Sequence, residues 1–170
     1  THAHLNFPAF EKDLDKVIKR AFENNISIIN VGTEYKTSKR AVEISQKYEK
    51  GVYSAIGLHP IYLVYNLIKS KLKEEKESQV KEENFDEEKY KKLINSEKVI
   101  AIGEIGLDYY YKPKGKRKFN LLKERQKEAL LNQLKLAKKI NLPVIFHCRA
   151  SHNDLLNILE NINFKIEGVI

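Results

Sequence analysis

The sequence has a single cysteine, no methionine, no tryptophan, and only seven glycines and four prolines among its 170 residues. One cysteine excludes an internal disulfide framework and is compatible with a reducing compartment, so we expect the cytoplasm or the nucleus. No apolar run approaches the roughly 20 residues that span a bilayer, and the sequence predicts no membrane contact. No signal peptide is visible, but the chain begins at Thr1, and a clipped N-terminus leaves secretion open.

Two glycine-rich phosphate loops are also absent. No Gly-x-Gly-x-x-Gly follows the first expected strand, and no such loop ends in Gly-Lys-Ser/Thr. The first loop binds the pyrophosphate of dinucleotides, and the second binds the phosphates of nucleoside triphosphates. Their absence disfavours a dinucleotide-binding protein and a nucleoside triphosphatase.

The length and composition are those of one domain with a sizeable core. Apolar residues make up 42% of the chain and charged residues 32%, which is ordinary for a protein with a heavily charged surface. The formal net charge of +8 favours anionic partners through long-range attraction. On its own, this charge is a weak indication of nucleic acid or a phosphate-bearing substrate, and nothing in the sequence predicts a protein partner.

Apolar runs alternate with amphipathic segments along the whole chain. The amphipathic segments predict helices over residues 10–24, 37–48, 89–94, 119–140 and 151–162, the last with Ser151 as its N-cap. The apolar runs predict strands around residues 1–5, 26–31, 52–57, 99–102 and 142–146, and a sixth begins within 165–170. This order is typical of right-handed βαβ units and a parallel sheet. We predict one domain over residues 1–170, with a charged, solvated insert over residues 66–92.

An acid at the end of a buried strand is the most informative feature. The run Val99–Ile102 stops at Gly103-Glu104, and a carboxylate is costly to bury without a cationic partner. His4, His59 and His147 also fall at the ends of expected strands. If the sheet curls into a barrel, residues at the carboxyl ends of its strands converge on one mouth.

This convergence predicts a metal centre. His2 and His4 are two residues apart, so an extended strand directs both imidazoles to one face, where they can bind one cation. His4, His59, Glu104 and His147 come from four different strands and would converge on the same mouth. Imidazoles with a carboxylate suit Zn²⁺, Mn²⁺ or Fe²⁺, and a carboxylate can also hold Mg²⁺. A carboxylate on a central strand can bridge two ions, which together clamp the oxygens of a phosphoryl displacement.

Further side chains belong near the same mouth. Arg149 follows His147 by two residues and either binds a phosphate or pairs with a carboxylate of the barrel. Asp108 either braces its loop or contacts ligand or substrate. Cys148 faces the other side of its strand and is expected to pack under a helix, and His152 is expected to be structural.

A basic segment follows three consecutive tyrosines. Five of the seven residues in 112–118 are lysine or arginine, directly after residues 109–111. Basic side chains neutralise phosphates, and tyrosine rings stack on unpaired bases. The segment is therefore either a nucleic-acid contact or a solvated turn.

Several blocks of the sequence resemble the TatD family of metal-dependent deoxyribonucleases. They are Thr1-His-Ala-His4, Gly57-Leu-His-Pro60, Gly103-Glu-Ile-Gly-Leu-Asp-Tyr-Tyr110, Leu142-Pro-Val-Ile-Phe-His-Cys-Arg149 and Gly168-Val-Ile170. The resemblance implies a TIM (β/α)8 barrel hydrolase that uses two divalent ions, such as Mg²⁺, Mn²⁺ or Zn²⁺, to cleave DNA, often as a 3′→5′ exonuclease.

The resemblance also implies roles for individual residues. His2 and His4 would hold one metal, Glu104 would bridge both ions, and His147 would hold the second. His59 would line the substrate mouth and act with Glu104 in catalysis. The remaining residues would contact DNA: Arg149 would bind phosphate, and Asp108 and Tyr109 would lead the strand toward the basic segment.

The chain departs from the family pattern in its extent. The family continues for about another half of a barrel, with a histidine directly after Gly-Val-Ile and a later aspartate that acts as general base. We therefore expect a fragment of about five and a half β/α units. Two alternatives to a DNase stay open: a related metallohydrolase acting on an ester or amide, and a non-catalytic fragment that binds nucleic acid.

Overall fold

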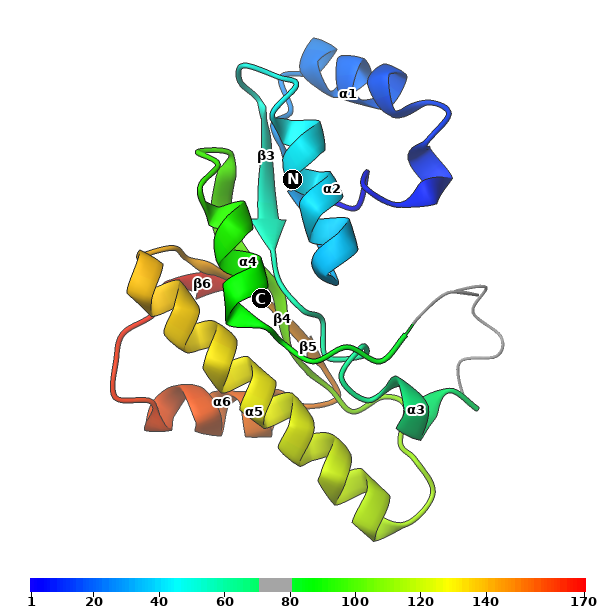
Figure 1. Ribbon diagram of the computed structural model, residues 1–170, viewed down its shortest axis with the longest axis vertical. Helices are drawn as coiled ribbons and strands as arrows, with labels where there is room; N and C mark the ends of the chain where they lie inside the picture. The colour runs from blue at the N-terminus through cyan, green and yellow to red at the C-terminus, as the bar shows by residue number, and fades with distance from the viewer. Residues whose placement is uncertain (71–80) are drawn as a thin grey trace.

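A computed structural model describes residues 1–70 and 81–170 (Figure 1). Its strands form one parallel six-stranded sheet in the order β1-β2-β3-β4-β5-β6, which is the sequential order of a β/α barrel. The strands are β1 (His2–Ala3), β2 (Ile28–Val31), β3 (Val52–Ile56), β4 (Val99–Asp108), β5 (Val144–Arg149) and β6 (Gly168–Val169). The predicted parallel alternation is confirmed.

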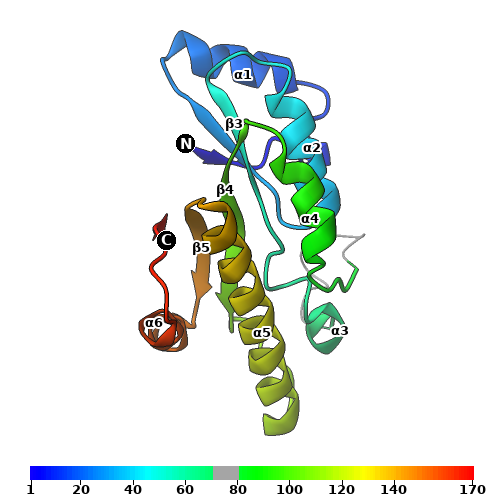
Figure 2. The ribbon, with the colours of Figure 1, turned by 60° about the vertical axis from the view of Figure 1, so that its left-hand side comes forward.

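The helices cover one face of this sheet. They are η1 (Pro8–Phe10), α1 (Leu14–Glu23), α2 (Tyr35–Ser45), α3 (Tyr65–Ile68), α4 (Glu87–Ile94), α5 (Lys116–Ile140) and α6 (His152–Asn161). Helices α2, α4 and α5 lie side by side against the strands (Figures 1 and 2). None of the helices within the described residues has the length and apolar character needed to cross a membrane.

The two faces of the sheet carry different apolar clusters. The main core lies between the sheet and the helices and includes Ile102 and Leu107 of β4. The opposite face, on the inside of the curled sheet, carries a smaller cluster of Val31, Ala55, Ala101 and Ile145. Because side chains alternate along a strand, this assignment shows which positions face the interior of the barrel.

Several element boundaries differ from the prediction. Helix α1 begins at Leu14 because Pro8–Phe10 form a separate 3-10 turn. Helix α5 begins at Lys116 and so includes part of the basic segment 112–118. Ser151 is the N-cap residue of α6, as predicted, but its hydroxyl donates to the carbonyl oxygen of Leu107 (2.8 Å) and makes no cap hydrogen bond.

The charged segment is only partly described. Residues 71–80 of the predicted insert lie outside the described residues. After them, the Glu82 carboxylate accepts hydrogen bonds from Arg125 of α5 (2.8 Å) and from the backbone N–H of Asn66 (2.9 Å). Tyr90 of α4 is 1% exposed and belongs to the main core. These parts of the segment pack on the fold, contrary to the expectation of a solvated insert.

Strand β4 contains a bulge that decides where its acid points. The β4–β5 register shifts between Ile102 and Ile105, and both isoleucines lie in the main core although two residues, and not one, lie between them. One extra residue therefore lies between them, and a bulge of this kind re-aims a side chain. Strict alternation would direct Glu104 under the helices, whereas the bulge brings it to the face that carries Ala101. The predicted end of this strand before Glu104 is wrong, because β4 continues to Asp108.

Two glycines allow β4 and β5 to approach closely beside this bulge. A Cβ on Gly103 would lie 2.7 Å from the Cβ of Ile145. A Cβ on Gly106 would overlap the carbonyl oxygen of His147, and the φ of Gly106, +153°, is one that L side chains rarely adopt. The absence of these side chains keeps His147 within reach of Glu104.

Candidate metal centre

Four predicted metal ligands meet on one face of the sheet: His2 and His4 come from β1 and the residue after it, Glu104 from within β4 and His147 from within β5. The Nε2 atoms of His2 and His4 lie 3.7 and 3.8 Å from Oε2 of Glu104. The other carboxylate oxygen, Oε1, lies 2.8 Å from Nδ1 of His147. The bulge in β4 thus places one carboxylate between imidazoles that come from opposite sides.

Two groups of side chains within the described residues could each hold a metal ion, and they share Glu104. One group is His2, His4 and Glu104, and the other is His59, Glu104 and His147. The ligand atoms of each group lie within 4.8 Å of one another. Imidazole nitrogens and a carboxylate suit Zn²⁺, Mn²⁺ or Fe²⁺, so this donor set fits a divalent cation.

The ring of His4 is oriented for metal binding. Its Nδ1 lies 2.9 Å from the carbonyl oxygen of Val31, which can only accept, so Nδ1 carries the proton and Nε2 presents a lone pair. Phe7 stacks on the same ring with centroids 4.8 Å apart. Nε2 of His2 lies 3.3 Å from Nε2 of His4, and burial lowers the pKa of His2 more than the Glu104 carboxylate raises it. Burial therefore favours the neutral form of His2, which is the form that ligates a metal.

His59 has a different tautomer. Its Nδ1 accepts a hydrogen bond from the backbone N–H of Ile61 (3.1 Å), so the neutral ring carries its proton on Nε2. Burial and the neighbouring His147 lower the pKa of His59 to about 3, which keeps the ring neutral. The rings of His59 and His147 meet edge to face with centroids 4.1 Å apart. While the Ile61 contact persists, His59 offers a hydrogen-bond donor and no free lone pair.

His147 lies between two carboxylates. Its Nδ1 contacts Glu104, and its Nε2 lies 3.0 Å from Oδ2 of Asp108. Burial lowers the pKa of His147, but the hydrogen bonds to Asp108 and Glu104 outweigh burial and raise it to about 9. Burial likewise raises the pKa of Glu104, but the hydrogen bond from His147 and the nearby histidines bring it to about 2. In this arrangement His147 is an imidazolium and Glu104 a carboxylate.

Asp108 connects the centre to its surroundings. Its Oδ2 accepts hydrogen bonds from Nε (2.9 Å) and Nη2 (2.8 Å) of Arg149, and its Oδ1 accepts from the backbone N–H of Tyr110 (3.0 Å). The side chain of Gln126, buried on α5, bonds to both backbone groups of Asp108. Asp108 therefore holds its own loop and the Arg149 side chain in place. The ion pair with Asp108 is one of the two roles predicted for Arg149.

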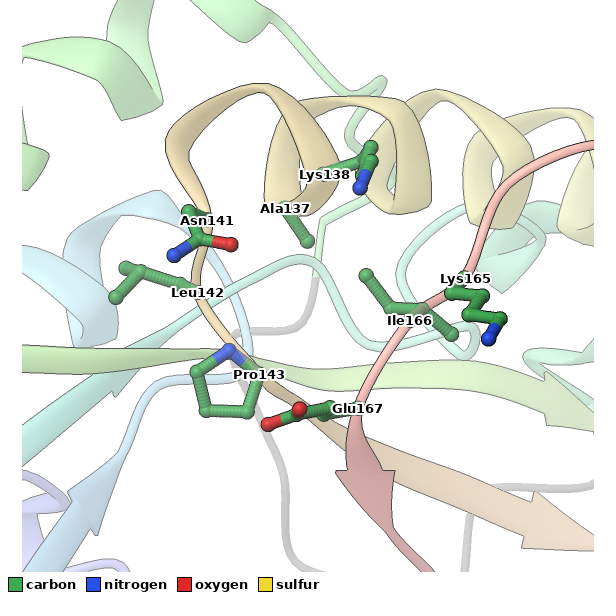
Figure 3. A pocket seen from close by; sticks show the side chains of 8 residues that line it. All are labelled: Ala137, Lys138, Asn141, Leu142, Pro143, Lys165, Ile166 and Glu167. Atoms are coloured by element: carbon green, nitrogen blue, oxygen red, sulfur yellow. The ribbon is translucent and has the colours of Figure 1, made fainter.

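A cavity of about 250 Å³ opens over the centre. It is lined by His4, Phe7, Thr33, His59, Ile61, Tyr62, Glu104, His147 and Arg149. Another cavity, of about 210 Å³, lies between the end of α5 and the segment before β6 (Figure 3). Lys138, Lys165 and Glu167 are the charged residues of that second cavity, and none of them belongs to a metal-binding group.

Three predicted site residues do not line this cavity: His2 and Asp108, which contact Glu104 and His147 from beside it, and Tyr109, which points elsewhere. The side chain of Tyr109 is 4% exposed and packs against Phe119, with ring centroids 5.7 Å apart. The next residue, Tyr110, is 62% exposed.

Sequence reasoning also missed Thr33 and Gln126. Thr33 lies just after β2, and this position at the end of a strand could have indicated it. Gln126 is a polar residue on the buried face of α5, and that placement could have indicated it.

Comparison with known proteins gives a consistent result. A family model described as "TatD related DNase" matches residues 1–170. The chain is 37% identical to the uncharacterized metal-dependent hydrolase YabD of Bacillus subtilis (strain 168), covering 100% of this chain and 58% of YabD. It is 30% identical to the 3′-5′ ssDNA/RNA exonuclease TatD of Shigella flexneri serotype 5b, covering 98% of this chain and 55% of that protein.

Structural comparison gives the same family. The crystal structure of YjjV, a TatD homologue from Escherichia coli K12, matches with a TM-score of 0.68 and 34% identity, covering 94% of this chain and 54% of YjjV. The predicted fold class, part of a parallel β/α barrel, is confirmed by this match. The chain spans between half and three-fifths of the length of these relatives. It belongs to the family of TatD-related DNases.

Proposed function

We propose that the protein is a divalent-metal-dependent deoxyribonuclease that hydrolyses phosphodiester bonds with two ions, acting from the 3′ end of a strand. The observation that carries this proposal is that two groups of candidate ligands share the single carboxylate of Glu104. Two-metal sites recur in nucleases and phosphatases because two nearby ions clamp the attacking and leaving oxygens. The direction of cleavage is proposed from the relative described as a 3′-5′ exonuclease.

Each residue has a role in this proposal. His2 and His4 would hold one ion, His147 would hold the other, and Glu104, whose two carboxylate oxygens face the two sides, would serve both. Ions bound there would activate a water molecule and neutralise charge on the phosphate. The N–H of His59 donates to a phosphate oxygen, because its other ring nitrogen is occupied by the backbone.

Arg149 binds the phosphate from the side of the cavity. Its side chain lines the cavity and is 40% exposed, although Asp108 accepts hydrogen bonds from Nε and Nη2; in this proposal a guanidinium N–H that Asp108 does not engage donates to the phosphate. The carboxylate partner orients the guanidinium before substrate arrives, which reduces the entropy lost on binding.

Cleavage should depend entirely on added metal. The protein, expressed from its complete reading frame, should convert a 5′-labelled single-stranded oligonucleotide into a ladder of shorter labelled products with Mg²⁺, Mn²⁺ or Zn²⁺. A chelator should abolish the ladder, because the ligand set can neither activate water nor neutralise phosphate by itself. Products cut at internal positions would contradict the exonuclease direction, and no cleavage with any of the metals would contradict the nuclease.

Metal binding should release a proton from His147. At neutral pH this ring is protonated between two carboxylates, with a pKa raised to about 9, and a ligating imidazole must be neutral. We expect release of about one proton at pH 7 and an apparent affinity that rises about tenfold per pH unit up to about pH 9. Titration calorimetry in buffers of different ionisation enthalpy measures the released proton, and binding without any release at pH 7 would contradict the assignment.

A further inference from the structure

An exposed aromatic ring stands beside the cavity and has no role in the proposed chemistry. Tyr110 is the second residue after β4 and leaves 62% of its surface exposed, whereas its neighbour Tyr109 is 4% exposed. The guanidinium of Arg149, which lines the cavity, lies 4.6 Å from the centroid of the Tyr110 ring. An aromatic ring that faces solvent next to a phosphate-binding cation is the combination that sites for single-stranded nucleic acid use.

The Tyr110 ring is fixed in place relative to the metal centre. Its backbone N–H donates to Oδ1 of Asp108 (3.0 Å), while Oδ2 of the same carboxylate contacts both Arg149 and His147. Tyr111 meets the ring edge to face at 4.9 Å. One buried carboxylate therefore contacts a candidate metal ligand and a cation and also holds the backbone from which the Tyr110 ring projects, and Arg149 and Tyr111 lie against that ring.

The charge around the ring favours a polyanion. The residues after Tyr111 include five cations within 112–118, while Glu and Asp are absent from that segment. Lys112 lies over the ring of Phe119 at 5.7 Å and so keeps its charge at the surface close to the tyrosines. A strand that leaves the cavity at Arg149 would pass Tyr110 and then meet this basic segment.

We propose that Tyr110 is a stacking platform for an unpaired base of the nucleotide next to the phosphate bound at Arg149. This inference rests on the proposed nuclease function and gives it a substrate class: single strands and unpaired 3′ ends, of any sequence. Every base has a face that stacks on an aromatic ring. Bases inside a duplex already stack on their neighbours and are not available to Tyr110.

Binding without catalysis tests the proposal. With chelator present, the wild-type protein and variants are titrated into a fluorescent single strand, an abasic strand of equal length and a duplex. Tyr110→Ala should weaken single-strand binding by about 5- to 100-fold, the loss expected for one stacked base. It should leave the abasic strand and the duplex unchanged, and Tyr110→Phe should bind as wild type does. Phe22→Ala, which alters a 38%-exposed aromatic residue on α1, is the matched control.

Each other outcome overturns the inference. Equal weakening on the abasic strand would show a contact to the backbone and no base stacking. Single-strand binding unaffected by Tyr110→Ala would remove the platform while leaving the nuclease proposal intact. Failure of the wild-type protein to bind the single strand in chelator would overturn the platform, whereas the metal-dependent cleavage assay decides the nuclease proposal separately.

Discussion

Replacing Glu104 by glutamine should reduce metal-dependent hydrolysis by at least about 100-fold and leave the fold intact. Loss of groups that merely support metal ligands costs about 10- to 100-fold in affinity or activity, and Glu104 is the ligand shared by both groups. Glutamine keeps the shape but brings an amide N–H₂ toward imidazoles that need an acceptor or a cation. It also removes the charge that holds the proton on His147, so the pKa of His147 should fall.

The number of bound ions separates this loss from a general defect. Calorimetry should show fewer bound ions, or weaker binding of all of them, in Glu104→Gln than in the wild-type protein. Glu43→Gln is a matched control, because its carboxylate is 53% exposed and pairs only with Lys39 across one helical turn (3.7 Å). A Glu104→Gln variant with wild-type activity and ion stoichiometry would remove Glu104 from its bridging role.

The metal ligands could be predicted because a parallel sheet imposes a simple geometric rule. Carboxyl ends of parallel strands share one edge, so histidines separated by more than a hundred residues, such as His4 and His147, meet without any knowledge of packing. The same rule places Thr33 after β2, where the cavity includes it. Fold and ligand set therefore follow from periodicity and from the position of residues after apolar runs.

The details that depend on register could not be predicted in this way. The bulge in β4 is invisible to period-two alternation, because one inserted residue changes the face of every side chain after it. The same limit applies to the tyrosines: two adjacent residues of one type differ in exposure, Tyr109 buried and Tyr110 exposed. The register of β4 against β5 places Asp108 directly opposite Arg149. No sequence pattern encodes this register, so Asp108 could not be predicted as the partner of Arg149.

Asp108 should be the most sensitive position for stability. Its side chain is 3% exposed and contacts Arg149, His147 and the backbone of Tyr110. Asp108→Asn keeps the volume but places an amide donor against two cations, and loss of one partner from a buried ion pair costs about 3–5 kcal/mol. Because the Arg149 side chain is 40% exposed, we expect the low end, about 3 kcal/mol of unfolding free energy, from chemical denaturation of the metal-free protein.

A surface pair and the pH dependence together test this assignment. Glu23→Gln breaks the Lys19–Glu23 pair (4.0 Å), whose side chains are 80% and 60% exposed, and should cost at most about 1 kcal/mol. Burial raises the pKa of Asp108, but its hydrogen bonds with His147 and Arg149 lower it to about 2, below the ordinary 3.8. A carboxylate whose pKa is lowered by folding stabilises the fold at pH values above its ordinary pKa of 3.8. This stabilisation is lost as the pH falls toward 2, the pKa in the folded protein. The difference in unfolding free energy between the wild-type protein and Asp108→Asn should therefore become smaller as the pH falls from about 5 to about 2. If this difference in unfolding free energy stays constant over that range, the charge of Asp108 does not stabilise the fold.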